Sequence, residues 1–239
     1  MTARWMQLLA GLAGAAAVMA APGCSSSPSG PNYDPQIPAS WAGAVTNPFF
    51  PLVPGTTYTY ESQTSEGLET NTVEVLQATK MVNGVAATEV HDRVYLDGEL
   101  KEDTYDWYAQ DSETADVWYL GEDTKELENG QVVSTAGSWE WGVNGALPGI
   151  VMWSDPTAHV GEAYRQEFAE GEAEDWAKVV ALDQSVDVPH GSFTGCLETE
   201  DWNDLDSGPH EHKFYCPSIG TTLEVGGGGE RTELVDVTP

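Results

Sequence analysis

The chain has 239 residues, of which 40% are hydrophobic and 10% aromatic, and its formal net charge is −30 at pH 7. This hydrophobic content suffices for a packed core and excludes global disorder. A chain this acidic repels nucleic acids and anionic lipid headgroups. We therefore expect no nucleic-acid partner, and the charge favours cations or basic partners. A simpler interpretation of the charge is solubility.

Residues 1–23 have the pattern of a secretory signal peptide. Arg4 supplies the positive start, and an apolar run over residues 8–21 follows it. That run is too short, and too rich in Ala and Gly, for a membrane span. We expect it to be removed on export.

Cys24 follows this segment at once and precedes three serines. Residues 21–24 (Ala-Pro-Gly-Cys) resemble the lipobox of bacterial lipoproteins, in which the cysteine becomes the lipidated first residue. The resemblance implies a membrane anchor through Cys24, and Ser25 implies the outer membrane. The alternative is ordinary cleavage after Ala20, which would leave a secreted protein with a free Cys24.

Residues 24–40 are rich in Pro and Ser and show no apolar periodicity. Such a composition predicts a flexible, semi-extended tether between the anchor and the folded part.

Residues 41–239 contain short β-branched and aromatic runs separated by Gly, Pro, Asn and Asp, and no amphipathic helix. This pattern predicts one all-β domain, an antiparallel sandwich or a barrel-like curved sheet of roughly ten or more strands built from consecutive hairpins. We expect strands over residues 56–61, 69–80, 85–96, 99–109, from 118, 131–141, 163–169, 175–188, 192–202, 210–216, 221–225 and 231–237, and a loop over 144–150.

Asp97 and Gly98 predict a two-residue hairpin turn between residues 85–96 and 99–109. Continued without a bulge, this register places Asp92 opposite Asp103 on the apolar face, with Val90 and Trp107. It places Arg93, Glu102, Glu89 and Asp106 on the face in water. If buried, the two aspartates would share a proton or hold a cation; the alternatives are a position near the sheet edge or a bulge that shifts the pairing.

Cys196 and Cys216 flank the next hairpin, centred on residues 205–208. If the two cysteines face each other, a cross-strand disulfide suits an exported protein. It would contribute roughly 3 kcal/mol by closing this loop. The alternative is two free thiols.

The same register places Glu200 opposite His212, with His210 on the same strand face as His212. Two imidazoles and a carboxylate are a candidate site for Zn or another transition metal. A solvated His–Glu pair is the alternative. Residues 201–208 resemble a calcium loop but lack its central glycine, so only weak Ca²⁺ binding by clustered acids is expected.

Five tryptophans could form a sugar-stacking platform with carboxylates nearby: Trp107, Trp118, Trp139, Trp141 and Trp153. Alternate tryptophans on a strand are also typical of a packed core. No catalytic motif for nucleotide, metalloprotease or serine-hydrolase chemistry occurs in the chain.

Residues 48–52, 106–111 and 117–122 also resemble segments of an uncharacterised family of secreted all-β proteins. The resemblance covers most of residues 47–237 and implies an exported β domain, with no activity attached. The sequence therefore predicts a surface-anchored, non-enzymatic envelope domain that binds or carries a ligand or partner. The alternative is a carbohydrate-active or metal-dependent hydrolase.

Overall fold

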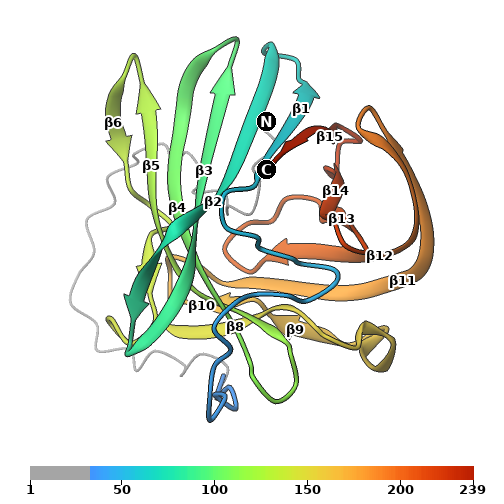
Figure 1. Ribbon diagram of the computed structural model, residues 1–239. Helices are drawn as coiled ribbons and strands as arrows, with labels where there is room; N and C mark the ends of the chain where they lie inside the picture. Colours follow the sequence, from blue (N-terminus) through green and yellow to red (C-terminus); the bar gives the residue numbers. More distant parts are fainter. Residues whose placement is uncertain (1–32) are drawn as a thin grey trace.

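A computed structural model describes residues 33–239, and the predicted signal peptide and Cys24 lie outside the described residues. The described chain folds into a 15-stranded sheet, whose neighbouring strands are antiparallel. The sheet curves into a nearly closed barrel (Figure 1). The predicted all-β, barrel-like fold is confirmed.

The strands follow one another around the barrel in the order β10-β8-β5-β4-β3-β2-β1-β15-β14-β13-β12-β11-β9, and β6 and β7 add to β5. Most neighbouring strands are therefore also consecutive in the sequence and form hairpins, as is usual in antiparallel sheets. The strands are β1 (Thr57–Gln63), β2 (Leu68–Val82), β3 (Val85–Leu96), β4 (Glu99–Gln110), β5 (Val117–Glu128), β6 (Gln131–Ser134), β7 (Trp139–Glu140), β8 (Leu147–Met152), β9 (Ala163–Arg165), β10 (Glu167–Phe168), β11 (Asp175–Val188), β12 (Gly191–Asn203), β13 (Glu211–Cys216), β14 (Gly220–Val225) and β15 (Arg231–Thr238).

The two ends of the sheet are joined by the short segment that carries β9 and β10. β9 pairs with β11, whereas β10 pairs with β8 at the opposite end of the strand order. Gly149 of β8 lies so close to this segment that a Cβ atom there would meet the carbonyl oxygen of Arg165 at 2.4 Å. Only glycine permits this approach.

Three two-residue Asn-Gly or Asp-Gly turns, including the predicted one at Asp97, join β2 to β3, β3 to β4 and β5 to β6. Asn83, Asp97 and Asn129 have φ of 43°, 49° and 51°, and the glycine after each also has positive φ. These values fit the turn geometry that matches strand twist.

The register predicted between β3 and β4 is correct next to the turn and wrong beyond it. Leu96 pairs with Glu99 and Tyr95 with Leu100, but Val94 pairs with Glu102. The extra residue, Lys101, forms a bulge that shifts all later pairs by one position. Asp92 therefore lies opposite Thr104, and Arg93 opposite Asp103.

The bulge also exchanges the two faces of β4 relative to β3. Val90 and Asp92 face inward together with Asp106, whereas Trp107 packs in a separate cluster on the outer face. The assignment of Glu102 and Asp106 to water was thus wrong, because Glu102 is 7% and Asp106 3% exposed.

Three further expectations for the strands were wrong. Residues 163–169 form two strands, β9 and β10, which pair with different neighbours. Residues 131–141 form two separate short strands, β6 and β7, rather than one. Residues 144–150 are not all loop, because β8 begins at Leu147 and supplies the partner of β10. Pro148 is tolerated here in a strand near the seam of the barrel.

The inner core combines the barrel wall with the segment that enters it. Val45, Phe50 and Leu52 pack inside against Tyr58, Tyr108 and Tyr215. Tyr58 donates through its hydroxyl to the carbonyl of Pro51, at 3.4 Å. Residues 45–52, which we call the entry segment, therefore fill part of the barrel interior.

The predicted disulfide between Cys196 and Cys216 is present, with a Cα–Cα distance of 4.1 Å. Both cysteines are fully buried in an outer-face cluster with Val186 and Leu223. The predicted pairing of β12 with β13 is also confirmed, since Glu200 lies opposite His212.

The predicted tether over residues 24–40 does not stand clear of the barrel along its whole length. The Tyr33 hydroxyl donates to the carbonyl of Pro148 at 2.9 Å, and its ring contacts Phe168. At Tyr33 the chain is therefore held against β8 and β10.

Candidate binding site in the barrel interior

Acidic side chains dominate the buried charged residues of the described chain. Nine acids are less than 10% exposed, against the two bases Arg165 and Lys213. Burying a carboxylate without a partner is costly, so such an excess requires an explanation. The acids are Glu69, Asp92, Glu102, Asp106, Asp116, Glu122, Glu167, Asp201 and Glu224.

The wall made by β3, β4 and β5 brings several of these acids together. Asp106 lies directly opposite Glu122, and Glu102 lies opposite Glu126. Like charges in directly opposed positions destabilise a sheet. Such opposed acids favour protonated carboxyl groups or a nearby cation.

Asp92 and Asp106 have distinct hydrogen-bond environments. The Tyr119 hydroxyl donates to Oδ1 of Asp106 at 2.6 Å. Asn71 Nδ2 approaches Oδ2 of Asp92 only at 3.5 Å, and Oδ1 of Asp92 is buried with no partner among the described residues. Asp92 thus has an unused acceptor in the protein interior.

Burial raises the pKa of Asp92 well above its usual range, and the carboxyl groups of Asp106 and Glu102 raise it further. Burial likewise raises the pKa of Asp106 to about 7, against the hydrogen bond from Tyr119. Burial therefore favours the protonated form of Asp92, and the pKa of Asp106 lies close to neutral pH.

A second acidic pair lies beside the seam of the barrel. Glu167 of β10 and Asp175 of β11 hydrogen-bond to each other, and the Trp139 indole donates to Glu167 at 2.5 Å. Burial raises the pKa of both carboxyl groups. Two carboxyl groups in direct hydrogen bond share a proton, so this pair fastens β10 to β11 while it is protonated.

The opposite wall holds the one buried ammonium group of the described interior. Lys213 Nζ lies 3.4 Å from Oδ2 of Asp201 and 3.7 Å from Oε1 of Glu224. Burial alone would lower the pKa of Lys213, but the carboxylates of Glu224 and Asp201 outweigh it and raise this pKa well above its usual range. Lys213 therefore offsets one of the two charges on this wall, and burial raises the pKa of Glu224.

A cavity of about 50 Å³ lies between the entry segment and the wall that carries Asp92 and Asp106. Its volume exceeds the space that one water needs, roughly 10–15 Å³. The lining is mostly apolar and aromatic and contains no Lys, Arg or His: Phe50, Pro51, Leu52, Tyr58, Tyr60, Val73, Val90, Asp92, Asp106, Tyr108, Ile219, Gly220 and Thr221. A concave apolar site with few polar groups is the usual form of a small-ligand site.

The candidate metal residues lie on the outer face of β12 and β13, away from this cavity. His210 Nδ1 pairs with Glu200 at 2.8 Å, but His212 Nδ1 pairs with Glu198, also at 2.8 Å. Lys178 is also 2.5 Å from Glu200. The structure thus brings the three residues to one face but divides the histidines between two carboxylates.

Within residues 33–239, no group of three or more His, Cys, Asp or Glu side chains is arranged to hold a metal ion. The acids of residues 201–208 also diverge, because Asp201 faces inward to Lys213 whereas Asp204 accepts from Arg165 and Trp176. Zn and Ca²⁺ binding there remain predictions.

The five tryptophans considered as a sugar platform do not share one face. Trp139 packs inside the barrel, whereas Trp107 and Trp118 are buried in the outer cluster beside Trp141. Trp153 is half-buried and stacks on His159, with ring centroids 3.8 Å apart. Indoles covered in this way leave no open row of ring faces for a sugar.

Searches against protein-family models, curated proteins and solved structures find no match for the chain. Among the described residues, no helix is long and apolar enough to span a membrane.

Proposed function

We propose that the chain is a lipid-anchored envelope protein whose barrel binds a small ligand and catalyses no reaction. The observation that carries the proposal is the cavity between the entry segment and β1–β4, which places a buried carboxylate among aromatic side chains. The export signal and the cysteine at residue 24 support the location.

Binding can be tested with paired core variants that each add one methylene. Val90 lines the cavity, whereas Val75 belongs to the same core but does not line it. We expect small molecules that raise the melting temperature of the full chain to lose this effect in Val90→Leu and keep it in Val75→Leu. No stabilising molecule in a panel of small amines, alcohols and acids would contradict the proposal.

The anchor is tested on the mature N-terminus. Mass spectrometry of the protein isolated from a bacterial host should find acyl chains on Cys24, and Cys24→Ala should release the protein from membranes. An unmodified N-terminus at Ala21 would refute lipidation and leave a secreted protein.

A further inference from the structure

Asp92, which has one unpartnered carboxylate oxygen, is among the residues that line the cavity. Asp92 is 6% exposed, and its Oδ1 meets no hydrogen-bond donor among the described residues. Asp106, at 3% exposed, lines the same cavity and accepts one hydrogen bond from Tyr119. The acidic part of the cavity can therefore accept hydrogen bonds from a ligand.

The remaining lining favours a cation over a neutral donor. Phe50, Tyr58, Tyr60 and Tyr108 surround the carboxyl groups, and aromatic faces attract cations at short range. The base adjacent in sequence, Arg93, pairs with Glu74 at 3.2 Å on the outer face. No basic side chain of the lining competes for Asp92.

The exposure of the lining residues orients the cavity. Pro51, Val73, Ile219 and Thr221 are partly exposed, whereas Asp106, Tyr60 and Tyr108 are buried. The carboxyl groups thus form the deep end and an apolar rim forms the mouth. The volume of about 50 Å³ leaves room for a few heavy atoms at the deep end, and a longer chain would extend through the mouth.

We propose that this cavity binds a primary alkylammonium ion, whose nitrogen donates to Asp92 and Asp106 and whose alkyl chain lies against the apolar rim. The proposal rests on the binding function above and names its ligand class. A primary ammonium has three donors, which suits an unpartnered carboxylate oxygen better than a quaternary ammonium does.

Ligand binding has a proton balance that can be measured. Burial and the neighbouring Asp106 and Glu102 raise the pKa of Asp92, against the smaller effects of Asn71 and Arg93. Burial therefore favours a proton on Asp92 in the empty cavity, and an ion pair with the ammonium requires that proton to leave to solvent. We expect release of about one proton for each ammonium bound.

The test is titration calorimetry of the full chain with n-propylammonium in two buffers of different ionisation enthalpy. Matched probes are propan-1-ol, tetramethylammonium and CaCl₂. We expect n-propylammonium to bind more tightly than all three, with an apparent enthalpy that depends on the buffer.

Asp92→Asn removes the charge while it keeps the shape of the side chain. It should weaken n-propylammonium binding by about tenfold or more, the range for a charge-assisted hydrogen bond. Glu69→Gln is the matched control, because Glu69 is also buried and has an unpartnered Oε1 but lies outside the lining. Its affinity should equal that of the original chain.

Each other outcome overturns the inference in a distinct way. Equal binding of propan-1-ol, or tighter binding of tetramethylammonium or Ca²⁺, rejects the primary ammonium but leaves the binding function in place. Absence of binding by every probe and by the panel used above rejects both. If Asp92→Asn does not unfold cooperatively, the buffer dependence of the original chain decides alone, and its absence rejects the ion pair.

Discussion

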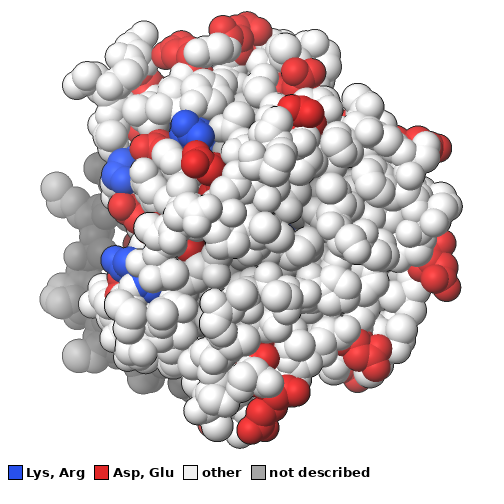
Figure 2. Space-filling view, in the orientation of Figure 1, with Lys and Arg blue, Asp and Glu red and all other residues white. Residues whose placement is uncertain are grey.

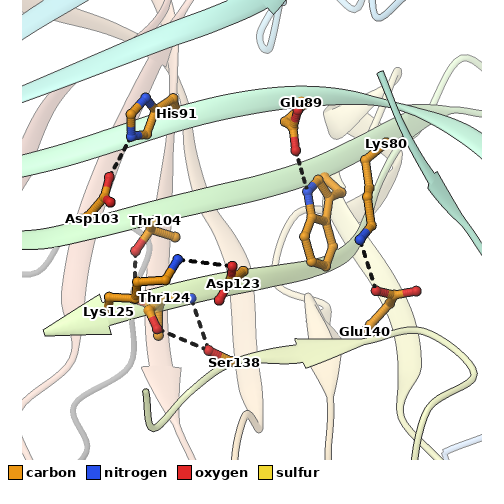
Figure 3. Close-up of polar contacts among 11 residues, drawn as sticks. Lys80, Glu89, His91, Asp103, Thr104, Asp123, Thr124, Lys125, Ser138 and Glu140 are labelled. Carbon is orange, nitrogen blue, oxygen red and sulfur yellow. Dashed lines mark hydrogen bonds and ion pairs between the residues drawn. The ribbon is translucent and has the colours of Figure 1, made fainter. Parts of the chain in front are cut away.

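The outer and inner faces of β3–β5 differ in whether their acidic side chains lie beside basic ones. On the outer face, acids meet bases: His91 with Asp103, Lys125 with Asp123, and Lys80 of β2 with Glu140 (Figure 3). The space-filling view shows the few basic side chains on its face gathered to one side, beside acidic ones (Figure 2). On the inner face, Asp92 and Asp106 come from the same strands and line a cavity that has no basic side chain.

The difference shows which acids have a structural role and which are available for binding. An exposed ion pair is solvated and contributes little, about 0–1 kcal/mol. Burial instead raises the pKa of a carboxyl group that has no base beside it, which favours its neutral form. Asp92 and Asp106 line a cavity that has no basic side chain, whereas Asp201 and Glu224 of the opposite wall lie beside Lys213.

The largest expected effect on stability is that of replacing Lys213, the buried base of the opposite wall. Lys213→Met leaves Asp201 and Glu224 buried without their ammonium partner, and we expect a loss of about 3–5 kcal/mol in the free energy of unfolding. Urea unfolding at neutral pH measures it. Lys178→Met is the control, since Lys178 pairs with Glu200 at the surface; equal losses in the two variants would argue against a distinct buried site.

Asp106→Asn should stabilise the folded chain rather than destabilise it, by an amount that depends on pH. The pKa of Asp106 is 3.8 as the ordinary value and about 7 in the folded chain. The folded state therefore holds the extra proton between these values, so its stability falls as the pH rises through this window. Above it, we expect Asp106→Asn to be more stable than the original chain by about 2–4 kcal/mol.

Urea unfolding at pH values across that window checks this prediction. The slope of stability against pH should be smaller in Asp106→Asn. A variant that is destabilised above the window, or that keeps the full slope, would show that Asp106 is not held neutral.

Asp103→Asn is the same substitution on the other face of β4. Asp103 contacts His91 Nε2 at 2.5 Å and is partly exposed. We expect the free energy of unfolding to fall by about 0.5–1 kcal/mol, because the substitution weakens a partly exposed pair. Stabilisation comparable to that of Asp106→Asn would remove the distinction between the faces.

The smallest expected effect is that of Arg93→Met, which separates Arg93 from Glu74 on the outer face. We expect a loss of at most about 0.5 kcal/mol, and unchanged affinity for n-propylammonium. A large loss of affinity in this variant would mean that the outer face acts on the cavity.

The strand pattern and the turns of the fold could be predicted from local sequence. Asn83-Gly84 and Asp97-Gly98 determine their turns because few other dipeptides accept positive φ at both positions. The bulge at Lys101 could not be predicted, because no glycine or proline marks it. Its consequence is large, since a shift of one residue exchanges the faces of a strand.

The candidate binding site was missed for the same reason. Tyr105, Trp107 and Ala109 alternate with Asp106 and Tyr108, so both faces of β4 look apolar and the acids were assigned to water. The barrel instead buries the acidic face and covers the other with Trp41 and Trp141. Closure through Gly149 also depends on long-range approach, which local patterning does not report.

Infrared spectroscopy of the folded chain tests the central claim most directly. At neutral pH, buried protonated carboxyl groups should give a C=O stretching band that disappears on unfolding, weakens in Asp92→Asn and is unchanged in Asp103→Asn. Saturating n-propylammonium should reduce the same band as Asp92 loses its proton. A folded chain without this band would contradict the account, because its inner carboxyl groups would then all be ionised.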